Sequence, residues 1–178
     1  MRVCTVSYKE CWQDENGRWL SDGGFPLQMS SIASLFDAST LVIGSGEHRS
    51  GGLPLPVDAT VVTLRSPHGR NLRRKVSVVL RIGEYLSTIV KHARCADVVH
   101  VPLPGDIPFL AMCVALVTRK RLLARYGGSW YPNSETTFMN RVTRSLLRRI
   151  AGGKRVVIAA GEGVSRPAPK IGWIFATP

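Results

Sequence analysis

The chain has 178 residues, of which 44% are hydrophobic and 20% charged, and this composition excludes a disordered chain and favours one globular domain. The formal net charge of +12 and the isoelectric point near 10.3 indicate attraction to an anionic partner such as nucleic acid, an acidic membrane surface or a phosphorylated ligand. The first residues lack the apolar segment of a signal peptide, and no apolar run is long enough to cross a bilayer, so we expect a cytoplasmic protein.

The four cysteines are Cys4, Cys11, Cys95 and Cys113. They form no CxxC pair and have no histidine at the spacing of a zinc site, so no metal site is expected. We expect all four to be reduced thiols, as is usual in the cytosol.

Strands and helices alternate in the first half of the chain. Short apolar runs predict strands at residues 2–8, 39–43 and 60–64. Pro26 suits the first turn of a helix at residues 26–36. Residues 44–58 are rich in Gly and Pro and predict a surface loop. Residues 71–94 show the pattern of one long amphipathic helix, and Gly83 within it could mark close packing against a neighbouring element.

The central unit spans residues 96–130. It predicts a buried strand at 98–101, a helix at 107–117 and a second strand at 122–126, which together form a parallel βαβ unit. A helix at 136–150, a strand at 155–159 and a last short strand at 171–175 follow. The whole pattern predicts a three-layer α/β/α, Rossmann-like domain with a mostly parallel sheet over residues 1–178.

Ligands of open parallel sheets bind at the carboxyl ends of the strands, which selects the first candidate residues. Gly23 and Gly24 precede the first helix and either approach a phosphate or sugar or form a plain flexible turn. His100, at the end of the central strand, is either a packed, hydrogen-bonded residue or a catalyst. Asp106 is either the cap of the following helix or an acid or base.

Further candidates follow the next two strands. Tyr126 and Trp130 flank Gly127 and Gly128, either as an aromatic wall beside a backbone that a ligand can approach or as a strand end and a loop anchor. Glu162 is either a surface carboxylate or a hydrogen-bond acceptor for a polyol.

Arginines line one face of the helix at 136–150. Arg141, Arg144, Arg148 and Arg149 are either a solvated helix face or a surface for an anionic partner, and peripheral contact with an anionic membrane is one such use.

The order of these pieces resembles the amino-terminal domain of GT-B glycosyltransferases, especially the retaining enzymes of family 4. The glycine pair after the first strand, the central stretch ADVVHV (residues 96–101), residues 122–130 with their glycine turn, and RRIAGGKRVVIAAGE (residues 148–162) carry the resemblance. The family often has a histidine where this strand ends in Tyr126.

The resemblance implies an acceptor-binding half of a transferase that moves a sugar from a nucleotide-sugar co-substrate to a glycan or lipid-linked acceptor in polysaccharide biosynthesis, without a metal or other cofactor. No catalytic residue is assigned. The family's donor-binding domain is absent from this sequence, so we expect a truncated or split enzyme that is inactive alone and needs a separate donor-binding domain or chain.

Two other classes of protein compete with this interpretation. A non-catalytic basic α/β module binding nucleic acid or another anionic partner fits the charge, although the aromatic residues do not alternate with the basic runs as stacking platforms would, and no specific nucleic acid is expected. A small-molecule enzyme that uses a nucleotide at Gly23 and Gly24 lacks the glycine fingerprint.

Overall fold

A computed structural model describes the chain except for residues 68, 70, 132–135, 161–165 and 175–178. The strands are β1 (Arg2–Gln13), β2 (Trp19–Ser21), β3 (Ala38–Ser45), β4 (Leu53–Pro54), β5 (Ala59–Arg65), β6 (Val98–Leu103), β7 (Arg121–Tyr126), β8 (Arg155–Ala160) and β9 (Ile171–Ile174). The helices are α1 (Phe25–Ala33), α2 (Asn71–Leu80), α3 (Ile82–Cys95), α4 (Asp106–Val117) and α5 (Phe138–Ile150).

Parallel strands form the body of the sheet, in the order β5–β3–β1–β6–β7–β8–β9. From β1 the chain first adds strands on one side, through β3 to β5, and then crosses back to place β6 on the other side of β1. The sheet therefore reverses its direction of growth between β1 and β6, which is the topological switch point of a doubly wound fold. The end of β1 also continues into an antiparallel extension with β2 and β4.

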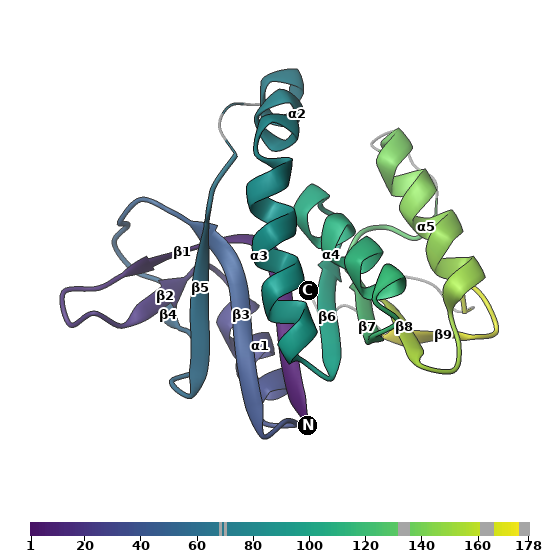
Figure 1. The fold of residues 1–178 in the computed structure, drawn as a ribbon, viewed down its shortest axis with the longest axis horizontal. Coiled ribbons are helices and arrows are strands. Elements are labelled where there is room, and N and C mark those ends of the chain that lie inside the picture. Colours follow the sequence, from purple (N-terminus) through teal and green to yellow (C-terminus); the bar gives the residue numbers. More distant parts are fainter. Residues whose placement is uncertain (68, 70, 132–135, 161–165, 175–178) are drawn as a thin grey trace.

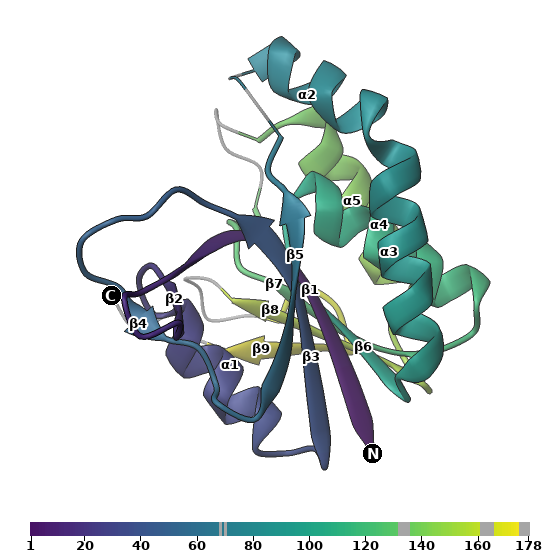
Figure 2. The same ribbon diagram turned by 60° about the vertical axis from the view of Figure 1, so that its left-hand side comes forward.

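Helices cover both faces of the sheet (Figure 2). On one face, Phe25 and Met29 of α1 pack against Leu41 and Ile43 of β3 in a small core. On the other face, α3, α4 and α5 cover the larger core, to which the alternate side chains of β1, β6, β7 and β8 contribute. The three-layer, Rossmann-like α/β fold with a mostly parallel sheet is thus confirmed.

Several element boundaries differ from those predicted. The first strand was predicted to end at residue 8 but runs to Gln13, because its end pairs with the antiparallel β2. The predicted helix at 71–94 is two helices that meet at Arg81, a residue with non-helical backbone angles. Gly83 marks no close packing, because a Cβ there would have no neighbour within 4 Å.

Candidate functional site

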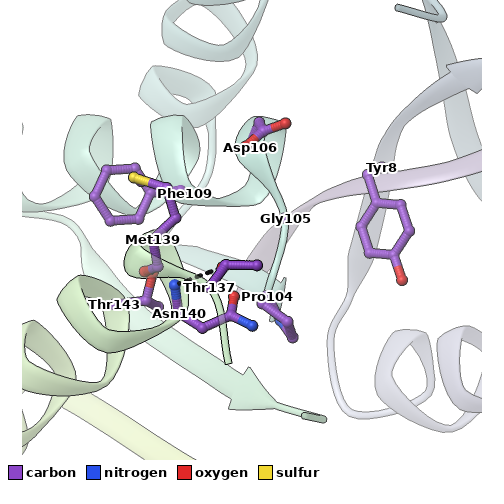
Figure 3. A pocket seen from close by; sticks show the side chains of 9 residues that line it. All are labelled: Tyr8, Pro104, Gly105, Asp106, Phe109, Thr137, Met139, Asn140 and Thr143. Carbon is purple, nitrogen blue, oxygen red and sulfur yellow. Dashed lines mark hydrogen bonds between the residues drawn. The ribbon is translucent and has the colours of Figure 1, made fainter. Parts of the chain in front are cut away.

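The switch point opens a crevice of about 320 Å³ at the carboxyl edge of the sheet. Tyr8 of β1 stands on one side of it, across from Pro104 in the β6–α4 connection and from the start of α5 (Figure 3). The volume lies within the range of small-molecule sites, and the place is the one that the fold predicts for a ligand.

Gly105 sets the shape of the turn that leads into α4. A Cβ on this residue would lie 2.7 Å from Tyr8 Cδ1 and 3.2 Å from Pro108 Cδ, so only glycine lets the tyrosine ring lie against the turn. Asp106 follows as the first residue of α4 and not as its cap, because the capping position belongs to Gly105. Its carboxylate lies at the rim, near the positive end of the helix dipole, which stabilises the negative charge.

The start of α5 forms the opposite wall. The Thr137 hydroxyl oxygen caps the helix by accepting a hydrogen bond from the Asn140 backbone N–H at 3.2 Å, and the Thr143 hydroxyl donates to the Met139 carbonyl at 2.8 Å. The Asn140 carboxamide points toward Pro104 (Figure 3).

Three polar groups of the crevice have no hydrogen-bond partner within the described part of the chain: the Tyr8 hydroxyl, the Asp106 carboxylate and the Asn140 carboxamide. A carboxylate accepts hydrogen bonds, whereas a carboxamide and a phenol both donate and accept. The crevice can therefore bind a ligand that offers several donors and acceptors.

A second crevice of about 350 Å³ lies on the other side of Tyr8, at the ends of β1, β3 and β5. Arg49 joins its walls, donating to Glu10 Oε2 at 2.9 Å and to Asp22 Oδ2 at 3.1 Å. These three side chains are 36% to 56% exposed, so solvent screens the ion pairs and they add little to stability. Because Arg49 already has two carboxylate partners, Lys9 is the cation in this crevice with no ion pair among the described residues.

Residues 127–131, the described part of the loop after β7, support the wall of the main crevice and do not line it. The Gly127 N–H donates to the Leu103 carbonyl at 2.7 Å, and a Cβ on Gly128 would touch Pro104 Cδ at 3.4 Å. Tyr126 is buried, and burial raises the pKa of its hydroxyl, against an opposing effect of Arg144. We predicted that Tyr126, Gly127 and Gly128 contact a ligand. In the structure they do not line the crevice, and the two glycines contact the β6–α4 connection at Leu103 and Pro104.

The arginines of α5 do not form one solvated stripe. Arg144 is buried and donates from Nη1 to the backbone carbonyls of Ser129 at 3.2 Å and Trp130 at 2.6 Å. The Arg148 guanidinium stacks over the Trp130 ring, 5.5 Å from its centroid. The interpretation of Arg144 as part of an anion-binding surface is wrong, because its guanidinium fixes the loop after β7.

The remaining candidates lie away from the main crevice. His100 is buried on the α1 side of the sheet, with Nδ1 3.1 Å from Thr5 Oγ1. Burial lowers its pKa to about 4, with a smaller effect from the charge of Arg125, so this imidazole is neutral near pH 7. Gly23 and Gly24 precede α1 and line neither crevice. Glu162 lies outside the described residues.

Of the predicted site residues that the structure describes, only Asp106 lines the main crevice. Tyr8 was missed, although it ends the first predicted strand and the switch-point rule could have selected it. Asn140 gave no signal in the sequence, because its position depends on how α5 packs beside α4. Among the described residues there is no cluster of three or more His, Cys, Asp or Glu side chains that could hold a metal ion.

Comparisons with known proteins correct the family assignment. No family model matches the chain, and no curated protein matches it. A solved structure that resembles it is the C-terminal domain of the coenzyme A biosynthesis bifunctional protein CoaBC, with a TM-score of 0.39 and 13% identity over 70% of this chain and 62% of that chain. The resemblance to GT-B glycosyltransferases is therefore wrong, and with it the transferase role in polysaccharide biosynthesis.

The physical reason for this error is that each motif was generic. A strand, a glycine turn and a basic helix recur in any parallel α/β domain, and their order follows from the fold alone. The alternative of a nucleic-acid-binding module gains no support from the comparisons either. The likeness to the CoaBC domain is also too distant to carry an argument about what this chain binds. Fold and site together define a Rossmann-like α/β domain with an open crevice at its switch point.

Proposed function

We propose that this domain binds a small, uncharged, polyhydroxylated ligand in the switch-point crevice. The observation that carries the proposal is that Tyr8, Asp106 and Asn140, whose polar groups have no partner within the described residues, all line one crevice of about 320 Å³. Hydroxyl groups can donate to the carboxylate and exchange hydrogen bonds with the carboxamide and the phenol. Pro104 and Phe109 add apolar surface for the carbon skeleton of such a ligand.

The charge of the crevice supports a neutral ligand. Asp106 is the only charged side chain among the described residues that line it, so an anionic group would meet repulsion at the rim. The lining offers no pair of nucleophile and base in hydrogen-bond contact among the described residues, and we therefore propose binding and not catalysis.

We also propose that the domain works in the cytoplasm, peripherally at the inner face of the membrane. The net charge of +12 supports attraction to anionic lipid, and the four free cysteines fit a reducing compartment. No helix in the described part of the chain has the length and apolar character needed to cross a bilayer.

Chemical-shift mapping tests the ligand proposal. We expect glucose or myo-inositol, added to the labelled protein, to shift the backbone amide signals of Gly105, Asp106 and Asn140 in a saturable way, whereas inorganic phosphate leaves them in place. The variant Asn140→Leu should weaken this binding up to about tenfold, the effect of losing one or two hydrogen bonds. The matched control Asp58→Asn changes an exposed carboxylate outside both crevices and should bind normally.

The outcome that would contradict the proposal is equally specific. Saturable shifts that fall elsewhere on the domain, or binding that is unchanged in Asn140→Leu, would exclude the crevice as the site.

A further inference from the structure

Five large apolar side chains stand exposed at the end of the molecule beyond the carboxyl edge of the sheet. We call them the apical patch: Val76, Val79, Leu80, Ile82 and Phe138. The first four belong to α2 and the start of α3, and Phe138 begins α5. Leu80 is 80% exposed and Phe138 is 77% exposed, so these side chains gain nothing from the core of the domain.

The two parts of the apical patch lie on either side of one apolar groove of about 440 Å³. Val79 and Ile82 line the groove from one side, and Phe138 lines it from the other. Figure 1 shows that α2 and the start of α5 lie at the same end of the molecule. A contiguous apolar surface of this kind marks a place where a soluble domain meets another phase or partner.

Basic side chains border the apical patch. Arg73 lies three residues before Val76 and seven before Leu80, so the three share one face of α2. Arg81 connects α2 and α3, and the exposed Arg141 follows Phe138 by three residues on α5. Among the described residues, two carboxylates stand nearby: Glu84 in the first turn of α3, and Asp106 on the lining of the groove.

We infer that the apical patch docks this domain on an anionic lipid surface, with the apolar side chains in the headgroup region and the arginines against lipid phosphates. Exposed apolar residues flanked by cations are the pattern of peripheral membrane contact, in which apolar insertion and electrostatic attraction act together. The inference builds on the proposed location at the membrane and is independent of which ligand the crevice binds.

The arrangement favours lipid over the other candidate occupants. Nucleic acid would gain from the arginines but would leave Leu80 and Phe138 exposed to water. A second copy of this basic chain would bring two positively charged surfaces together, because the molecule carries a net charge of +12.

Docking through the apical patch also orients the switch-point crevice relative to the membrane. The apolar groove and the switch-point crevice share Asp106, Phe109, Thr137 and Met139 as lining residues. A membrane at the apical patch therefore lies beside the crevice mouth, so a ligand carried on a lipid would reach it without leaving the surface.

Vesicle flotation of the full chain tests the inference. We expect binding to vesicles of equimolar phosphatidylglycerol and phosphatidylcholine at low salt, and weaker binding at about 0.5 M salt, where the Debye length is only a few ångströms. The double variant Leu80→Ser with Phe138→Ser should lose about tenfold or more of the partition coefficient. The variant Arg73→Gln with Arg141→Gln should lose about thirtyfold, which corresponds to about 2 kcal/mol.

A matched control separates the patch from exposed apolar residues in general. Val117 and Leu35 are 83% and 74% exposed but lie outside the apical patch, so Val117→Ser with Leu35→Ser should bind vesicles as the natural chain does. In a further variant, Phe138→Trp, we expect the added tryptophan emission to shift to the blue on acidic vesicles and to be quenched by lipids brominated along their acyl chains.

Each other outcome overturns the inference in its own way. Vesicle binding that is equal in the apical and control variants would move the docking surface elsewhere, and no binding to acidic vesicles would remove lipid altogether. Self-association that the apical variant abolishes would assign the patch to a second copy, and capture of single-stranded RNA in place of vesicles would assign it to nucleic acid. The crevice variant Asn140→Leu should keep its vesicle binding, so failure of the ligand proposal remains distinguishable.

Discussion

Acid should destabilise this domain through one buried imidazole, that of His100. The side chain is 1% exposed, and burial, with a smaller effect from the charge of Arg125, lowers its pKa to about 4. In the unfolded chain the same group titrates near the ordinary histidine value of about 6.5. Between these two pH values the unfolded state binds a proton that the folded state does not, so the free energy of unfolding falls as the pH falls.

The size of the effect follows from the difference between the two pKa values. Each unit corresponds to about 1.4 kcal/mol, so a pKa of about 4 for His100 in the folded chain removes about 3 kcal/mol of stability between pH 6.5 and 4. The loss is complete below the folded-state value, where both states are protonated. For a small domain this is a large share of the total free energy of unfolding.

Urea denaturation of the natural chain and of His100→Gln, each measured at several pH values from 7.5 to 4, checks the prediction. Glutamine keeps a polar group near Thr5 Oγ1 but does not titrate. The stability of the natural chain should fall by up to about 1.4 kcal/mol per pH unit relative to the variant, the slope of one proton.

His92 also makes the free energy of unfolding fall as the pH falls, in both the natural chain and the variant, because burial lowers its pKa. This contribution cancels in the difference between the natural chain and the variant. Equal slopes in the natural chain and His100→Gln, or an NMR titration of His100 near pH 6.5, would refute the reasoning.

Three further changes have expected outcomes. Arg144→Met should lower the free energy of unfolding in urea by about 2 kcal/mol, because the buried Trp130 carbonyl and the partly buried Ser129 carbonyl lose a charged donor. Gly52→Ala should cost about 1–3 kcal/mol, since φ is +96° and the new Cβ would lie 2.7 Å from Trp12 Cζ2, whereas Gly51→Ala, strained but uncrowded, should cost less in the same assay. After treatment with iodoacetamide at pH 8, mass spectrometry should find the exposed Cys95 modified. Cys4 and Cys11 should stay unmodified, because burial raises the pKa of each of these two thiols to about 12.

The layered fold could be predicted because its signals are local. The β-branched runs at β3 and β6, and the glycine pairs that follow β7 and α5, each mark an element or its end within a few residues. The alternation of such elements is enough to imply a parallel sheet with helices on both faces. The switch-point rule then selects the edge of that sheet at which the main crevice lies.

The details of the edge could not be predicted, because they depend on contacts between distant residues. The end of β1 continues past Tyr8 only because β2 and β3 pair with it, and its register against β3 shifts between Val6 and Glu10. The irregular part of β1 contains Tyr8, which lines both crevices and separates one from the other. No residue near Tyr8 in the sequence indicates this arrangement.

The net charge of the chain likewise could not predict where on the surface a partner binds. A total of +12 predicts an anionic partner but assigns no surface to it. In the structure, Arg144 holds backbone carbonyls, Arg148 stacks on Trp130, and Arg49 joins two carboxylates. Cations of this kind hold the fold together. Arg73, Arg81 and Arg141 make no such contact among the described residues, and they lie beside exposed apolar side chains. This difference is the reason that we propose the end of α2, and not the whole basic chain, as the surface that meets an anionic partner.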